Sequence, residues 1–292
     1  MTSSLLPGSR SRMVDAGGLQ MHVVEMGPED GEPVILLHGF PELWYSWRYQ
    51  MPALAESGYR VIAPDQRGYN LTDKHGPYDM HTLVGDIVHL ADSLGLPDAH
   101  VVGHDWGASI AWAMAAMYPH RVKRVVAMNG PHPALMTGIW RRHPKQLLRS
   151  WYMFWFQIPL VPERLLASRR LSLLARWWFA SANPARTTQR DLDVYEEAAR
   201  RPGALPAMLG WYRAAIREGA AAGGHVAIPA RIDVPACVIW GEDDFVLGRE
   251  CNEVLPRFVP DLKLHYVPGA SHWVQMDKPD EVNLILLQFL HG

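Results

Sequence analysis

Asp105 has a glycine two residues before it, Gly103, and a glycine two residues after it, Gly107. The apolar run 99–102 precedes this pattern, and the spacing predicts a helix from residue 108 to about 118. A nucleophile elbow has this form, because only small residues fit beside the strained residue that the turn lifts above the sheet edge. A carboxylate in this place displaces a leaving group from saturated carbon and becomes an alkyl ester, which water must then cleave. The pattern therefore predicts chemistry on epoxides or alkyl halides rather than on esters, although the same five residues also occur in ordinary turns.

A base and an orienting acid follow later apolar runs. His272 comes after the run 263–267 in a loop with Gly269, and an imidazole can take a proton from water and return it. Asp243 and Asp244 follow the run 236–240, and either could hold the ring or instead cap a helix. The order of acid nucleophile, second acid and histidine is the one that nucleophile-elbow hydrolases use.

A third loop, residues 38–42, reads His-Gly-Phe-Pro-Glu after the apolar run 34–37. Backbone N–H groups of Phe40 and Trp106 are the natural donors to the negative charge that builds up when water attacks an ester. An ordinary Gly-Pro turn is the alternative interpretation of this loop. We expect His104 to point down into the sheet and to be structural, because neighbouring residues of a strand face opposite sides.

The elements that must position these residues alternate along the chain. Short apolar runs predict strands at 19–25, 34–37, 60–63, 100–103, 122–129, 236–240 and 263–267, and helical spacing predicts helices at 80–94, 108–118, 252–258 and 279–290. This alternation predicts an α/β fold with a mostly parallel, doubly wound sheet. Residues 133–225 lack strand alternation, so we predict a helical lid inserted between core segments 1–132 and 226–292. We expect order everywhere beyond the first dozen residues.

Composition excludes several classes of protein. The chain has 292 residues and no apolar stretch near the roughly 20 residues that a membrane helix needs, so we expect no membrane span. Cys237 and Cys251 give no disulfide framework, and with no signal peptide a cytoplasmic protein is expected. There is neither a phosphate-binding loop nor a metal-ligand spacing of histidines, so we predict no cofactor and no metal.

The charge of the chain is unevenly distributed. Residues 133–225 hold 14 Lys and Arg against 6 Asp and Glu, whereas the rest of the chain holds 14 against 24. The basic residues are dispersed among apolar ones and no recognition motif accompanies them. We therefore interpret them as a solvated helical surface rather than a nucleic-acid interface.

Taken together, the motifs resemble those of epoxide hydrolases of the alpha/beta hydrolase fold. The likeness spans nearly the whole chain, and it rests on His-Gly-Phe-Pro-Glu at 38–42, Asp-Gln-Arg-Gly-Tyr at 65–69, Gly-His-Asp-Trp-Gly-Ala at 103–108, Trp-Gly-Glu-Asp-Asp-Phe at 240–245 and Gly-Ala-Ser-His-Trp at 269–273. The resemblance implies that Asp244, in a Gly-x-x-Asp pattern, is the orienting acid. It also implies that Tyr152 and Tyr212 protonate the epoxide oxygen, whereas from spacing alone these aromatic residues would be packing residues.

The resemblance implies an enzyme that converts an epoxide and water to a vicinal diol through an ester on Asp105. Haloalkane and haloacid dehalogenases use the same nucleophile and are the alternatives. The former commonly carry Asn or Glu at the position of Phe40 and generally lack the tyrosine pair, and fluoroacetate dehalogenases carry Arg at the position of Ser109. Both differences favour an epoxide hydrolase over a dehalogenase. A ligand receptor on the same fold is the non-enzymatic alternative.

The tryptophans of the predicted lid indicate the kind of substrate. Six of the 12 tryptophans fall in this segment and favour a small hydrophobic epoxide: Trp140, Trp151, Trp155, Trp177, Trp178 and Trp211. The sequence allows a homodimer. We expect the substrate to contact His38, Pro41, Trp106, Trp155 and Trp211.

Overall fold

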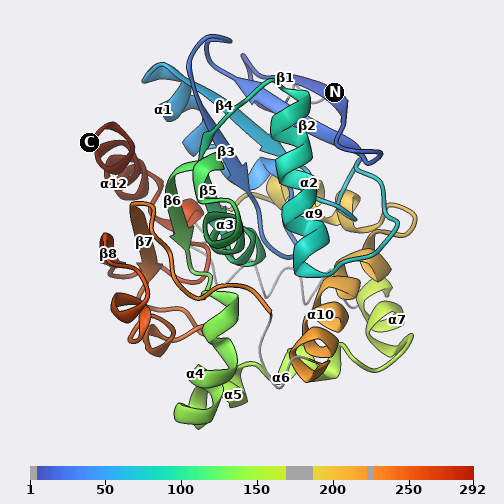
Figure 1. Cartoon of the computed structure of the whole chain (residues 1–292). Helices are drawn as coiled ribbons and strands as arrows, with labels where there is room; N and C mark the ends of the chain where they lie inside the picture. Colours follow the sequence, from blue (N-terminus) through green and yellow to red (C-terminus); the bar gives the residue numbers. More distant parts are fainter. Residues whose placement is uncertain (1–4, 169–186, 222–226) are drawn as a thin grey trace.

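The structure is a computed structural model that describes residues 5–168, 187–221 and 227–292. In these residues eight strands form one sheet in the order β1-β2-β4-β3-β5-β6-β7-β8 (Figure 1). The strands are β1 (Arg10–Asp15), β2 (Gln20–Met26), β3 (Glu32–Leu37), β4 (Tyr59–Pro64), β5 (Ala99–His104), β6 (Val122–Met128), β7 (Ala236–Gly241) and β8 (Leu262–Val267). Strand β2 pairs antiparallel with β1 and β4, and all other neighbours are parallel. The predicted mostly parallel sheet is confirmed.

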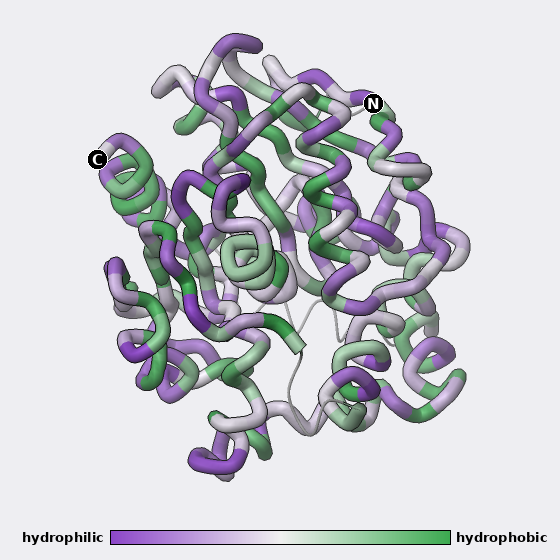
Figure 2. Tube along the Cα trace, viewed as in Figure 1, coloured by the Kyte–Doolittle hydropathy of each residue, from purple (hydrophilic) through white to green (hydrophobic). Residues whose placement is uncertain are grey.

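Helices cover both faces of the sheet. In β3, Ile35 and Leu37 pack in the core on the side of α2 (Met80–Ser93) and α3 (Trp106–Met117). The alternate residues Val34 and Leu36 pack in the core on the side of α1 (Gln50–Glu56) and α12 (Pro279–His291). Side chains of a strand alternate between faces, so a strand between two helical layers is apolar on both. The central strands are accordingly hydrophobic along most of their length (Figure 2).

A helical segment is inserted between β6 and β7. Its described helices are α4 (Met136–Arg142), α5 (Pro144–Arg149), α6 (Trp151–Trp155), α7 (Val161–Ala167), α9 (Gln189–Ala199) and α10 (Ala204–Ala221). The described part of this insertion contains no strand, as expected, while the lid boundaries 133 and 225 stay a prediction. Trp177 and Trp178 lie outside the described residues. Within the described ranges, no helix is both long and apolar enough to cross a bilayer.

One strand was not predicted, and one expected helix is wrong. No apolar run marks residues 10–15 as a strand, yet they form β1 against β2. All side chains of β1 except Val14 are exposed, so the strand has no apolar alternation to reveal it. The helix expected at 252–258 is instead two short 3₁₀ turns, Arg249–Cys251 and Leu255–Arg257. Pro256 lacks the N–H that a continuous helix would need there.

Candidate active site

Asp105 is the turn residue between β5 and α3. Its backbone has φ 50° and ψ −117°, in the positive-φ region that side chains other than glycine rarely adopt. Such strain persists only where the surroundings enforce it, and it is characteristic of functional turns. The turn places the carboxylate at the carboxyl end of β5, where the active sites of parallel sheets are found.

Glycines pack tightly around this turn. A Cβ on Gly103 would lie 2.2 Å from the Gly107 carbonyl oxygen, and one on Gly39 would lie 2.5 Å from the Asp105 Cβ. A Cβ on Gly130 would lie 2.5 Å from the Asp105 carbonyl oxygen. The loop after β3, the elbow and the loop after β6 therefore approach one another too closely for any side chain.

His272 lies between two carboxylates. Its Nδ1 is 2.8 Å from Asp244 Oδ2, and its Nε2 is 3.8 Å from Asp105 Oδ1. Asp244 is buried, and its Oδ1 accepts hydrogen bonds from the N–H groups of Val246 and Leu247. Asp243 is exposed. Of the two acids that the sequence leaves open, Asp244 is thus the one that contacts the ring.

The two carboxylates control the charge of the imidazole. Burial of the ring lowers the pKa of His272, but Asp244 and then Asp105 more than offset this and raise it to about 9. Burial also raises the pKa of Asp105, although His272 and the surrounding donors counteract part of that effect. The raised pKa favours the protonated, imidazolium form of His272 at neutral pH.

Two backbone donors reach the Asp105 carboxylate. The Phe40 N–H donates to Asp105 Oδ2 at 2.9 Å, and the Trp106 N–H also hydrogen-bonds to this side chain. These are the two groups predicted from the loop 38–42 and the elbow. They can stabilise negative charge on the carboxyl group as well as hold the carboxylate in place.

Tyr152 from α6 and Tyr212 from α10 face the same region from the insertion. Both side chains are buried, and their ring centroids are 5.9 Å apart. Burial, and then the charge of Asp105, raises the pKa of each phenol well above its ordinary value. The Trp106 and Tyr212 rings pack edge to face, with their centroids 5.0 Å apart.

A cavity of about 320 Å³ separates the core from the insertion and contains these groups. Its wall includes Asp105, Trp106, Tyr152 and Tyr212. Most of the rest is apolar: Met80, Pro131, Pro133, Met136, Trp140, Met153, Phe154, Ala215, Ile216, Ala220 and Leu247. Among the described lining residues, Asp105 is the only Asp, Glu, Lys, Arg or His.

Four of the five residues expected to contact the substrate do not line this cavity: His38, Pro41, Trp155 and Trp211. Trp211 is fully buried, and its indole N–H donates to the Arg67 carbonyl oxygen. His38 is also buried and accepts the Gln66 N–H. Trp155 packs against Trp151 and Phe156 within the insertion. Of the five, Trp106 alone lines the cavity. The other four could not be placed from the sequence, because which side of a helix or loop faces the cavity depends on how that element packs.

A buried pair behind the base was not predicted from the sequence. His104 Nδ1 is 2.7 Å from Glu42 Oε2, and His104 Nε2 is 2.9 Å from the His272 carbonyl oxygen. A carboxylate and a carbonyl can only accept, so both ring nitrogens donate and His104 is an imidazolium. Glu42 also accepts the Gly39 N–H, which ties this pair to the loop that carries Phe40. That His104 is structural stays a prediction, and its contact with the His272 carbonyl oxygen places it directly behind the base. Glu42, the last residue of the 38–42 motif, is the sequence signal that could have indicated this pair.

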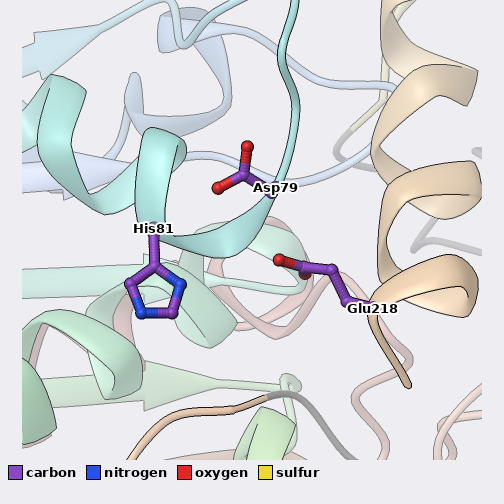
Figure 3. Close-up of side chains that lie close together, drawn as sticks. All are labelled: Asp79, His81 and Glu218. Carbon is purple, nitrogen blue, oxygen red and sulfur yellow. The ribbon is translucent and has the colours of Figure 1, made fainter. Parts of the chain in front are cut away.

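A separate polar cluster lies where α2 begins beside α10. One nitrogen or oxygen atom from each of Asp79, His81 and Glu218 lies within 4.8 Å of the others, and three such atoms could act as ligands of a divalent cation (Figure 3). Asp79 accepts the N–H and the hydroxyl of Thr82, and Glu218 accepts the Met80 N–H. Capping of the first turn of α2 therefore already accounts for both carboxylates.

Comparison with known proteins identifies the family. A model of the alpha/beta hydrolase fold matches residues 32–279. The chain is 41% identical over 288 residues to the AB hydrolase superfamily protein YfhM of Bacillus subtilis, covering 98% of this chain and 99% of that protein. It is 37% identical to epoxide hydrolase 4 of Homo sapiens, over 94% of this chain and 76% of that protein.

Solved structures agree. The crystal structure of a mutant epoxide hydrolase from Bacillus megaterium, in complex with its product (R)-3-[1]naphthyloxy-propane-1,2-diol, has a TM-score of 0.87 and 30% identity to this chain. The match covers 96% of this chain and 100% of the other. With the elbow, the parallel sheet and the helical insertion all present, this chain belongs to the alpha/beta hydrolase family and is closely related to its epoxide hydrolases.

Proposed function

We propose that this protein is an epoxide hydrolase, which adds water to an epoxide to form a vicinal diol through an ester on Asp105. The observation that carries the proposal is the pairing of a carboxylate at the elbow with two phenols, Tyr152 and Tyr212, on the wall of one cavity. An epoxide oxygen needs a proton as its bond to carbon breaks, and a halide does not, so the phenols favour epoxide opening over dehalogenation.

In the first step Asp105 attacks one ring carbon, and the carbon–oxygen bond breaks with its electron pair going to oxygen. Tyr152 and Tyr212 donate to this oxygen as its charge develops. The product is an ester of Asp105 that carries a neighbouring hydroxyl. The ester has no charge, so the imidazolium of His272 loses one of its two stabilising partners and releases its proton to solvent. The phenol that has protonated the new hydroxyl recovers a proton from solvent, so the step leaves a neutral phenol and a neutral imidazole.

In the second step neutral His272 removes a proton from water, which attacks the carboxyl carbon of the ester. Negative charge then collects on the carboxyl oxygen, where the N–H groups of Phe40 and Trp106 point. Collapse of this intermediate releases the diol and restores the carboxylate and the imidazolium. Asp244 holds the ring by its other nitrogen throughout.

The cavity wall supports a hydrophobic epoxide as the substrate class. Its described lining offers no cation that could hold a carboxylate, which counts against a haloacid, and Ser109 lines it where fluoroacetate dehalogenases have Arg. The Bacillus megaterium relative is bound to an aromatic diol product, which agrees with a cavity of this kind. We also propose that residues 133–225 form the lid over this cavity.

Hydrolysis in oxygen-18 water tests the proposal. In a single turnover with enzyme in excess, the new diol oxygen should come from the Asp105 carboxylate and be unlabelled, and label should enter Asp105 for later turnovers. Styrene oxide and a haloalkane of similar size should be compared as substrates. Solvent oxygen in the first-turnover diol, or faster turnover of the haloalkane, would overturn the proposal.

A further inference from the structure

The outer surface of α5 and α6 exposes large apolar side chains. Leu148 is 74% and Trp151 is 63% exposed, and Leu147 and Phe154 are also exposed. Leu148, Trp151 and Phe154 recur every three residues across α5 and α6, and Leu147 is next to Leu148, so the four lie near one another on the outer surface. Apolar side chains gathered on one surface commonly mark a contact with another body. We call this surface the lid face.

Three exposed cations stand close to these apolar residues in the chain, Lys145 on α5 and Arg141 and Arg142 at the end of the preceding helix α4, and we include them in the lid face. Arg141, Arg142 and Lys145 are exposed, and within the described ranges none of them makes a salt bridge. Residues 131–162 contain four Lys and Arg and no Asp or Glu. The fourth cation, Arg149, forms a salt bridge with Glu250, in which its guanidinium nitrogen lies 3.6 Å from a carboxylate oxygen. The lid face therefore combines three cations that form no salt bridge within the described ranges with exposed apolar surface.

The lid face continues to the substrate cavity. Phe154 lines the cavity and is 46% exposed, so it belongs to both surfaces. The Trp140 ring, also on the cavity wall, lies 5.8 Å from the Phe154 ring. Helices α4 and α5 lie at the end of the molecule away from β1 and β2 (Figure 1). A body that contacts the lid face would thus meet the rim of the cavity.

We propose that the lid face docks on an anionic lipid surface. Helical surfaces that rest on membranes carry Lys and Arg beside Trp, Phe and Leu, as this one does, and Trp is favoured at the boundary between lipid and water. Docking would bring the rim of the cavity to a phase in which hydrophobic molecules collect.

A second copy of the chain fits the lid face less well. Two identical faces in a symmetric dimer would bring Arg141, Arg142 and Lys145 of each copy toward those of the other, with no acidic residue in 131–162 to compensate. A lipid surface with negative head groups instead complements all three cations.

The test is binding to vesicles without substrate, so its outcome does not depend on the proposed function. Wild-type protein should sediment with phosphatidylcholine vesicles that contain phosphatidylglycerol, and much less with phosphatidylcholine alone. One Lys or Arg beside an anionic membrane strengthens binding about fivefold, so changing all three cations to Gln should weaken it on the order of a hundredfold. Leu148→Ser with Trp151→Ser should also weaken it. Both changes lie at exposed positions outside the catalytic groups.

A matched control removes the same charge elsewhere. Arg217→Gln, Arg257→Gln and Lys263→Gln neutralise three exposed cations outside the lid face that form no salt bridge within the described ranges, and they should leave vesicle binding nearly unchanged. The proposal is overturned if wild-type protein does not bind anionic vesicles. It is also overturned if the control variant loses as much vesicle binding as the lid-face variant. A dimer in light scattering that dissociates on Leu148→Ser with Trp151→Ser, without any vesicle binding, would assign the lid face to a second copy instead.

Discussion

Replacing Asp105 with Asn should convert His272 from an acid into a base at neutral pH. The exchange removes one negative charge and leaves a side chain of nearly the same size. An ester on Asp105 removes the same charge, so this variant imitates the electrostatic state of the intermediate. The effect depends on the short separation between the two side chains.

The expected size of the change follows from that separation. Asp105 Oδ1 and His272 Nε2 are 3.8 Å apart, and two unit charges at this distance interact by about 4 kcal/mol at an effective dielectric constant of about 20. One pKa unit corresponds to about 1.4 kcal/mol, so losing this charge should lower the pKa of His272 by about three units. Starting from about 9, the ring would titrate at roughly 6.

Nuclear magnetic resonance of protein with nitrogen-15 labelled histidine measures this directly. His272 is assigned by the signal that disappears in His272→Gln, and the intact mass confirms that the introduced amide has not hydrolysed back to a carboxylate. A kinetic readout should agree. The hydrolysis rate of preformed ester should rise with pH through about 6 and be level by pH 8, because deprotonated His272 is the active form.

A pKa of His272 that stays near 9 in the Asp105→Asn protein would refute the reasoning. Asp244 alone would then determine the charge of the ring. Hydrolysis of the ester would in that case continue to speed up toward pH 9, and formation of the ester could not be the event that prepares the base.

Three further outcomes are expected. In His272→Gln the ester should accumulate, because Asp105 attacks without giving up a proton, and the intact mass should rise by the mass of the substrate; an unchanged mass despite binding and an intact fold would contradict this. Tyr152→Phe and Tyr212→Phe should each slow ester formation from an epoxide at least tenfold, with the double variant nearly inactive and a haloalkane little affected; an unimpaired double variant would argue for dehalogenation. Glu42→Gln leaves a buried His104 imidazolium without its counter-charge and should lower the free energy of unfolding by about 3 kcal/mol in urea denaturation, with kcat reduced more than KM is altered; unchanged stability would show that His104 is neutral.

The order of elements along the chain was sufficient to predict which loops meet. Carboxyl ends of parallel strands share one edge of a sheet, so Asp105, Asp244 and His272 could be expected together from three separate motifs. Their proximity is observed, while the part that each plays in catalysis stays a prediction. The choice between Asp243 and Asp244 could not come from strand order, because it depends on which carboxylate the turn buries.

Features that arise from packing were not predictable in this way. The contact between Glu42 and His104 joins residues 62 positions apart, and no local pattern announces it. Trp155 was expected at the substrate, yet Trp140 lines the cavity, because the rotation of each short helix is determined by its neighbours. Strand β1 escaped detection because it lies at the sheet edge with its side chains in solvent.

The close packing of glycines at the elbow has a consequence for laboratory evolution of this protein. A methyl group at Gly39, Gly103, Gly107 or Gly130 would collide with backbone or with the Asp105 side chain at 2.0–2.5 Å. Libraries that randomise these positions should yield almost no folded, active variants, whichever substrate is selected. Met136, Thr137 and Ile216 line the cavity from helices α4 and α10 of the insertion and are not among these glycines. Substrate range should therefore change through the insertion, while the elbow is inherited unaltered.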